Sequence, residues 1–399
     1  MTRLLVYTGK GGVGKTSVAA ASALLCAAHG RRTLVVSTDI AHSLGDAFGR
    51  PIGPEPVAIA DDLWAQETDV YQSIRLYWGE IRRYIAEVFR WRGLDSIIAD
   101  EMSVLPGLDE LACLLRIVDH IDEGRFDVIV IDAAPTGETI RLLSLPEAAR
   151  WWLERILPIQ RRAVQLAGPM MSRLTGMPMP SSAVFRAGED LFRKLDRMHA
   201  LLSDPESASI RIVLNLEPMV IAEARRSFTY FHLFGYPTDL IVCNRVLPLE
   251  SGDYFAPLRA TQQRHLPIVR DSFAPVPLRT APYFAREVIG QESLRELGHA
   301  VFADEDPASF FHRGRPYEFE GRDGHYILSF DLPHVTLKDV DLIRDGDELI
   351  VQAGPWRRNL VLPRVLAELR TQDALLQDGV LRITFGPTER SIEEVARHE

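Results

Sequence analysis

The run Gly-Lys-Gly-Gly-Val-Gly-Lys-Thr at residues 9–16 constrains the fold of this chain more than any other feature. It matches the phosphate-binding pattern GxxxxGK[ST], follows a short apolar run and precedes an Ala-rich stretch. Glycines let backbone N–H groups turn toward phosphate oxygens, and the following helix N-terminus adds positive potential. We therefore expect Lys15 on the β- and γ-phosphates and the Thr16 hydroxyl on Mg²⁺. The predicted nucleotide ligands are Gly9, Gly11, Gly12, Val13, Gly14, Lys15, Thr16 and Ser17.

Lys10 is a second lysine inside the same loop. The chain has only four lysines, Lys10, Lys15, Lys194 and Lys338, whereas arginine supplies the other 41 of its 45 basic residues. A compact ammonium suits a crowded phosphate cradle better than a planar guanidinium does. A lysine at this place resembles the deviant class of P-loops. That resemblance implies that ATP binds across a dimer interface and that Lys10 contacts the partner's nucleotide.

Composition and charge narrow the class of protein. The 399 residues include 46% hydrophobic and 25% charged residues, which is typical of a soluble globular protein of about two to three domains. The net charge is −10, of which −7 lies between Asp304 and Glu399. Because no basic tail is present, we expect no nucleic-acid partner.

The three cysteines, Cys26, Cys113 and Cys243, are far apart and form no CxxC. We therefore expect a reducing compartment, no disulfide and no zinc or iron–sulfur site. The phosphate loop begins too early to leave room for a signal peptide, and no apolar run reaches the ~18 residues that suggest a membrane span. The sequence predicts a cytoplasmic protein without an integral membrane span.

Short apolar runs alternate with helical stretches over the first three quarters of the chain. Near-continuous apolar strands separated by helices indicate a mostly parallel sheet covered on both faces. We expect this α/β unit to span residues 1–303 and to end in a helix near residues 287–302. The apolar runs lie at residues 3–8, 33–38, 126–132, 210–214 and 239–243.

Beyond an acidic linker predicted at residues 304–316, the hydrophobic pattern changes. Short strand candidates there are separated by Asp-Gly and Gly-Pro turn signals. This pattern predicts a small all-β sandwich at residues 317–388, followed by a tail at 389–399. The strand candidates lie at residues 326–332, 348–353, 359–362 and 380–385.

Two aspartates follow apolar runs of the predicted parallel sheet. Asp39 ends the second run, where a carboxylate can orient or deprotonate the attacking water, although it could instead cap the next helix. Asp132 ends the third run in a Walker B pattern, where a carboxylate holds Mg²⁺, usually through water. We therefore expect ATP and Mg²⁺ as cofactors.

The phosphate loop, Asp39-x-Ala-His-Ser and Asp132-x-Ala-Pro-Thr-Gly together resemble the ArsA-type ATPases. That family includes the arsenite-pump ATPase and the ATPase that guides tail-anchored membrane proteins. Motifs at residues 106–110, 234–237 and 243–246 also resemble the family, so the similarity covers about residues 1–300. The resemblance implies an ATP-hydrolysing P-loop fold with an inserted helical subdomain.

The resemblance also implies roles for individual residues. Asp39 would activate water, Lys10 would act on the partner's nucleotide, and Asn244 would hydrogen-bond adenine. Pro277 and Leu278 would close over the base.

Two switch loops are implied in the same way. His42 lies in the first, where Ile40 replaces the family's usual proline. The second carries Glu138 where the family commonly has histidine. The targeting factors often use a zinc-binding CxxC that this chain lacks, so the resemblance implies no zinc. The residues of the second switch are Pro135, Thr136, Gly137 and Glu138.

Residues 150–200 occupy the place of the family's cargo-binding helices. Four of the chain's eight methionines fall within ten residues there. Methionine adapts to varied apolar ligands, although a methionine stripe can also be a buried helical core. The candidate cargo residues are Trp152, Ile156, Met170, Met171, Met177 and Met179.

The last domain carries a second resemblance. Residues 373–381, Asp-Ala-Leu-Leu-Gln-Asp-Gly-Val-Leu, are similar to the ending of an α-crystallin (small heat-shock protein) domain, and Phe330-Asp331-Leu332-Pro333 and residues 349–354 fit too. The similarity covers about residues 316–388. It implies a domain that binds client, packs on the ATPase or stabilises a dimer.

These patterns favour a homodimeric ATP-driven switch around hydrophobic cargo, such as a membrane-protein segment. An arsenite-pump subunit is one alternative, although the scattered cysteines resemble core residues. A MinD/ParA-like positioning ATPase is another, although an acidic β-domain fits neither membrane nor DNA binding.

Overall fold

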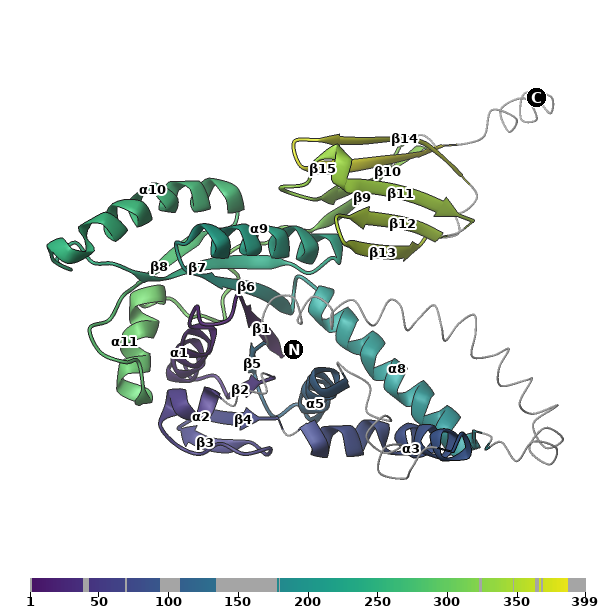
Figure 1. Ribbon diagram of the computed structural model, residues 1–399, viewed down its shortest axis with the longest axis horizontal. Coiled ribbons are helices and arrows are strands. Elements are labelled where there is room, and N and C mark those ends of the chain that lie inside the picture. The colour runs from purple at the N-terminus through teal and green to yellow at the C-terminus, as the bar shows by residue number, and fades with distance from the viewer. Residues whose placement is uncertain are drawn as a thin grey trace.

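The computed structural model describes residues 2–38, 43–68, 70–93, 108–133, 178, 180–322, 325–346, 348–362, 366 and 369–386. An eight-stranded sheet lies at the centre of the first domain, in the order β3-β4-β2-β5-β1-β6-β7-β8 (Figure 1). All neighbouring strands pair in parallel except β3 with β4. The strands are β1 Arg3–Thr8, β2 Thr33–Ser37, β3 Val57–Ala60, β4 Leu63–Glu67, β5 Val128–Asp132, β6 Ala208–Leu214, β7 Thr238–Val246 and β8 Leu278–Pro282.

Helices cover the central strands on both sides. In Figure 1, α1 and α11 lie on one side of β1, β2 and β5, and α5 and α8 lie on the other. The helices are α1 Lys15–Ala28, α2 Ser43–Phe48, α3 Val70–Trp91, α5 Leu108–Glu123, α8 Ser182–Ser203, α9 Pro218–Leu233, α10 Ala256–Phe273 and α11 Gly290–Phe302, with a 3₁₀ turn at Asp253–Phe255. None of the helices described here is long and apolar enough to cross a membrane.

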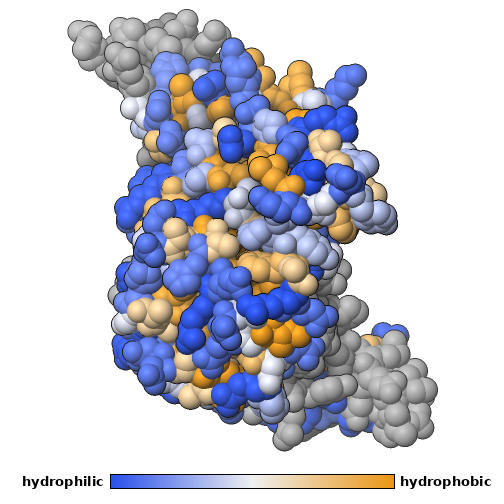
Figure 2. Space-filling view, turned by 90° about the vertical axis from the view of Figure 1, so that its left-hand side faces the viewer, coloured by the Kyte–Doolittle hydropathy of each residue, from blue (hydrophilic) through white to orange (hydrophobic). Residues whose placement is uncertain are grey.

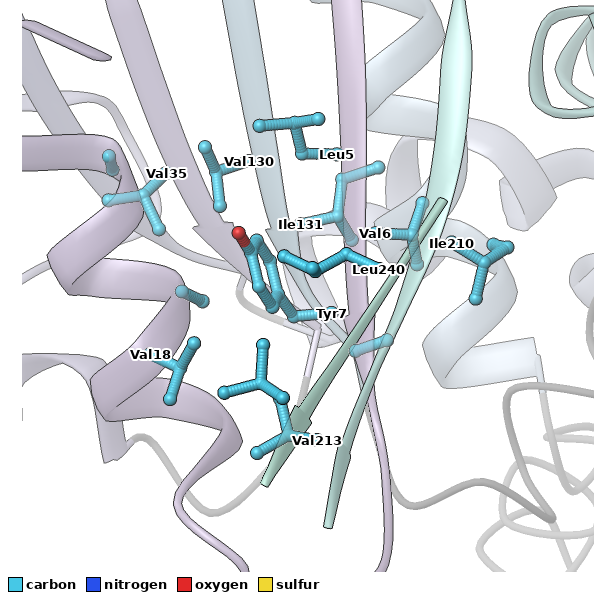
Figure 3. Close-up of a cluster of buried hydrophobic side chains, with 14 of the residues drawn as sticks. Leu5, Val6, Tyr7, Val18, Val35, Val130, Ile131, Ile210, Val213 and Leu240 are labelled. Carbon is cyan, nitrogen blue, oxygen red and sulfur yellow. The ribbon is translucent and has the colours of Figure 1, made fainter. Parts of the chain in front are cut away.

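The central strands are buried along their whole length because both of their faces are covered. Figure 3 shows Val18 of α1 facing Tyr7 and Val213, with Val35 and Val130 from neighbouring strands beside them. Branched side chains suit this double-sided burial because they fill the pleated surface. The core therefore holds β1 rigidly, and β1 leads directly into the phosphate loop.

The α/β fold with a mostly parallel sheet is confirmed, and each predicted apolar run of the first domain contains a strand. The prediction missed β3, β4 and β8. These strands lie at or near the edges of the sheet and are short. The strand β3 has only four residues, and polar residues interrupt the apolar runs of β4 and β8. The helix predicted near residues 287–302 is α11.

The second domain is the predicted all-β sandwich of antiparallel strands. One sheet has the order β14-β15-β10-β9 and the other β11-β12-β13, with an apolar core between them. The strands are β9 Tyr317–Arg322, β10 His325–Asp331, β11 Val340–Asp345, β12 Glu348–Ala353, β13 Trp356–Val361, β14 Arg370–Gln377 and β15 Val380–Gly386.

The predicted linker at residues 304–316 is packed against the first domain over part of its length. The Arg211 guanidinium, fully buried, pairs with Asp239 at 2.9 Å, and Arg3 approaches the same carboxylate at 3.3 Å. The Phe311 backbone N–H donates to Asp239 at 3.4 Å, and its ring lies 5.0 Å from the Arg211 guanidinium. This connection is therefore anchored near the edge of the sheet opposite the phosphate loop.

The sandwich rests on the C-terminal part of α9. Leu233 of α9 belongs to the sandwich's own apolar core. The buried Arg358 donates to the Leu233 carbonyl at 2.5 Å, and His232 Nδ1 lies 3.0 Å from Asp331. Trp356 packs against the cores of both domains. The two domains therefore share one continuous contact along this helix.

Candidate nucleotide-binding site

The phosphate loop connects the end of β1 to the start of α1. Gly9 has φ 154° and Gly14 has φ 91°, conformations that favour glycine. A Cβ on Gly9 would lie 2.1 Å from the Val213 carbonyl oxygen, and one on Gly14 would lie 2.3 Å from Asn244 Nδ2. Side chains are therefore excluded where the loop packs against the ends of β6 and β7, so the loop can lie close to the sheet and wrap phosphates with its backbone.

The predicted phosphate and magnesium ligands lie at the carboxyl edge of the sheet. Lys15 begins α1 and its side chain is buried. The Thr16 and Ser43 hydroxyls lie 3.0 Å apart. Asp132 is fully buried at the end of β5 and pairs in register with Tyr7 of β1. This donor set fits Mg²⁺, which prefers hydroxyl, carboxylate and phosphate oxygens.

Two residues at the end of β7 support the loop from outside. Asn244 Nδ2 donates to the Val13 carbonyl at 2.8 Å, and its Oδ1 accepts from the Arg245 backbone N–H at 2.9 Å. Arg245 has φ 57°, and its guanidinium donates to the Gly12 carbonyl at 3.0 Å. Arg245 was not predicted, because its role depends on a backbone turn that the sequence does not reveal.

A cavity of about 570 Å³ opens beside Gly14, Ser17 and Asn244, which belong to the predicted site. It is large enough for a nucleoside, since small-molecule pockets span about 300–1,000 Å³. Aromatic and apolar side chains from the segment between β8 and α11 form much of its wall. The lining residues from this part of the chain are Pro282 at the end of β8 and, after it, Tyr283, Phe284, Ala285, Arg286, Glu287, Val288 and Ile289.

Pro277 and Leu278 are not brought to this cavity, contrary to the expectation from the resemblance. The Pro277 carbonyl accepts from the Ile241 N–H at 3.0 Å, and Leu278 begins β8 in register with Ile241. They therefore lie at the amino end of β8, whereas the cavity adjoins its carboxyl end. The Pro-aromatic sequence at residues 282–284 was the available signal for the segment that lines the cavity.

Lys10 lies in the loop but contacts α9. Its ammonium is 3.8 Å from Glu223 Oε2, and the two side chains are 36% and 29% exposed. Lys15, in contrast, is only 7% exposed at the start of α1. The two loop lysines therefore occupy different surroundings.

Several predicted residues lie outside the described part of the chain. Asp39 and His42 belong to this group, as do the second switch and all the candidate cargo residues. Their roles remain predictions. The predicted residues concerned are Asp39, His42, Pro135, Thr136, Gly137, Glu138, Trp152, Ile156, Met170, Met171, Met177 and Met179.

Two of the three cysteines have described side chains, and both are buried. Burial raises the pKa of the Cys26 and Cys243 thiols to about 12. A thiol binds soft metals and metalloids as a thiolate, which such a pKa disfavours at neutral pH. Both thiols therefore behave as core residues.

Comparison with known proteins agrees with this geometry. The family of anion-transporting ArsA ATPases matches residues 2–303, and the HSP20-like domain found in ArsA proteins matches residues 323–385. The chain is 35% identical to putative arsenical pump-driving ATPase 1 of Aquifex aeolicus, over 96% of this chain and 99% of that protein. It is 36% identical to a putative arsenical pump-driving ATPase of Prosthecochloris vibrioformis, over 96% of each.

A more distant relative extends the comparison. ATPase GET3 of Mycosarcoma maydis is 28% identical over 74% of this chain and 89% of its own length. The phosphate loop, the cavity beside it and these matches all indicate hydrolysis of a nucleoside triphosphate. The chain belongs to the ArsA ATPase family and is an ATPase with a C-terminal HSP20-like domain.

Proposed function

We propose that this ATPase works as a homodimeric switch that binds and releases hydrophobic cargo, with membrane-protein segments as the cargo class. The observation that carries the proposal is the difference between the two loop lysines. Lys15 is buried at the start of α1, whereas the partly exposed Lys10 is directed toward α9. A lysine available at the surface of the loop is suited to reach the nucleotide of a second subunit.

Within one subunit, the proposed roles follow from the site. The loop backbone and Lys15 hold the phosphates, the segment at residues 282–289 holds the base, and Asp39 orients the attacking water. Thr16 and Asp132 hold Mg²⁺, which, when bound, offsets negative charge that develops on the phosphate oxygens. Hydrolysis releases the two switch loops, and an order change in such loops is a common way to alter a distant surface.

The proposed cargo region precedes α8 in the sequence, and α8 belongs to the helical side of the first domain. Helices α3, α5 and α8 pack on one another, and α8 begins shortly after the Met-rich stretch. On the face shown in Figure 2, hydrophobic residues form small groups separated by hydrophilic ones. We therefore place cargo binding on the helical side rather than on that face.

The proposal is tested by recovering what the protein binds when hydrolysis is blocked. Asp39→Asn should bind ATP without hydrolysing it, so cargo should accumulate on the purified protein. Mass spectrometry should find proteins with apolar membrane segments, and deletion of residues 168–183 should remove them. Lys15→Ala, which should not bind ATP, is the control. Equal recovery from all three proteins would contradict nucleotide-dependent cargo binding.

Arsenite-pump activity is the second candidate, and the names of two relatives favour it. It predicts that arsenite stimulates hydrolysis and that cysteine substitution abolishes the stimulation. The burial of Cys26 and Cys243 weighs against this candidate. Hydrolysis rates of the wild-type protein and a Cys113→Ser variant, each with and without arsenite, distinguish the two functions.

A further inference from the structure

The contact between Lys10 and Glu223 joins two segments that are far apart in the sequence. Lys10 lies in the phosphate loop, and Glu223 lies in the second turn of α9. Their charged atoms are 3.8 Å apart, so the contact is an ion pair without a close hydrogen bond. Both side chains are partly exposed, so water and salt screen the attraction. The pair is therefore easily broken.

The Glu223 carboxylate beside Lys10 competes with phosphate for the lysine ammonium group. While Lys10 faces Glu223, one of the two loop ammonium groups is neutralised by its own subunit. A nucleotide phosphate carries more negative charge than one carboxylate and can form shorter hydrogen bonds, so it competes well for the lysine. A partner subunit without nucleotide offers no such competitor.

The position of Glu223 is well defined by the fold. The N-terminal part of α9 follows β6, whose Val213 carbonyl contacts the phosphate loop at Gly9. The C-terminal part of α9 is held by the sandwich through Leu233 and Arg358. Because α9 is anchored at both ends, the backbone of Glu223 is held beside the loop, where its carboxylate is within reach of Lys10.

We propose that Glu223 is a positioning residue that holds Lys10 on its own subunit until the nucleotide of a partner subunit displaces it. This inference rests on the proposed homodimeric function. Glu223 thereby makes the contact of Lys10 with the partner conditional on nucleotide being bound to that partner. The ion pair must be broken before Lys10 can reach the partner. Because the pair is weak, nucleotide bound to the partner is enough to break it.

The first experiment measures the ion pair without relying on activity. Because the chain has only four lysines, the acylation rate of each can be followed by mass spectrometry. Without nucleotide, Glu223→Gln should raise the acylation rate of Lys10 about two- to fivefold, the range expected for one partly exposed ion pair. Lys338, in the second domain, is the internal reference. Added salt should shrink the difference, because screening weakens the pair in the wild-type protein.

The second experiment measures ATP hydrolysis against protein concentration. Glu223→Gln should lower the concentration that gives half-maximal activity by about the same two- to fivefold. Glu217→Gln is the matched control, because it removes the same charge from the exposed start of the same helix. It should leave both measurements unchanged.

The results that would contradict the proposal can be told apart. An unchanged Lys10 acylation rate in Glu223→Gln would show that the pair does not form, and the proposal would be wrong. A raised acylation rate with an unchanged half-maximal concentration would overturn the role of the pair in activation. If the wild-type protein stayed monomeric with ATP in analytical ultracentrifugation at the concentrations assayed, the homodimer would be contradicted, and the role of Glu223 with it.

Discussion

Asn244 shows how a single side chain supports the phosphate loop. Its amide group satisfies the Val13 carbonyl and the Arg245 N–H, and its Nδ2 occupies the space that a Cβ on Gly14 would need. A buried amide with both ends engaged is costly to remove, because its partners lose their hydrogen bonds. Asn244 therefore positions the loop in addition to lining the cavity.

The first prediction separates these two contributions of Asn244. Asn244→Ala should weaken ATP binding about tenfold, because an unsatisfied buried carbonyl costs roughly 1–3 kcal/mol and leaves the loop misplaced. Calorimetric titration with ATP and with GTP would measure this loss. Equal losses for the two nucleotides indicate loop support. A loss confined to ATP would show instead that Asn244 acts mainly by reading adenine.

At the scale of elements, α9 connects the two domains. Its first half lies beside the phosphate loop through Glu223, and its last turn contributes Leu233 to the core of the sandwich. A Cβ on Gly235, just after the helix, would lie 2.8 Å from the Tyr317 ring. The sandwich thus approaches the end of this helix closely, and movement of α9 must move both domains or break the contact.

The second prediction concerns this contact. Arg358→Ala should lower the free energy of unfolding by about 1.5–3 kcal/mol, because a buried charged donor to the Leu233 carbonyl is lost. The neighbouring Arg357 is exposed, so Arg357→Ala is the control and should change the value by less than about 0.5 kcal/mol. Urea unfolding of the full chain measures both. Equal losses would mean that the Arg358 contact does not join the domains.

At the scale of the whole molecule, several histidines are kept neutral by the fold. Burial lowers the pKa of His120, His312 and His334, with help from Arg116, His232 and Arg225 respectively. His120 lies in the first domain, where Nε2 is 2.8 Å from Gln66 Oε1. His312 lies in the segment at residues 304–316 and His334 lies in the sandwich. Histidines with a lowered pKa are therefore found in both domains and between them.

The third prediction is a loss of stability in mild acid. Each of these histidines has a lower pKa in the folded chain than the ordinary value of 6.5, so below pH 6.5 the unfolded chain binds more protons. Stability should therefore be complete above pH 7 and fall as the pH decreases through 6.5 toward 5. Melting temperatures between pH 5 and 8 measure this, and His120→Gln should flatten the profile. A flat wild-type profile would contradict the prediction.

Local patterns in the sequence were sufficient for much of this protein. The strand–loop–helix unit around residues 9–16, the parallel sheet and the β-sandwich were predictable because periodicity and turn residues act over short distances. The nucleotide ligands at residues 9–17 could be predicted as a group because one contiguous loop supplies them. The missed strands and the position of Pro277 and Leu278 at the amino end of β8 share a cause, because a short stretch of sequence shows neither the pairing of edge strands nor the direction of a strand.

The fold class, the nucleotide chemistry and the ATPase family could be inferred from the amino-acid sequence, because short runs of contiguous residues carry each of these signals. The groups from distant parts of the chain that complete the site become apparent in the folded molecule. Glu223 beside Lys10, Arg245 on the Gly12 carbonyl and the cavity wall at residues 282–289 come from separate helices, strands and loops. Their meeting depends on sheet order and helix packing, which arise from the burial of the whole core rather than from any single segment.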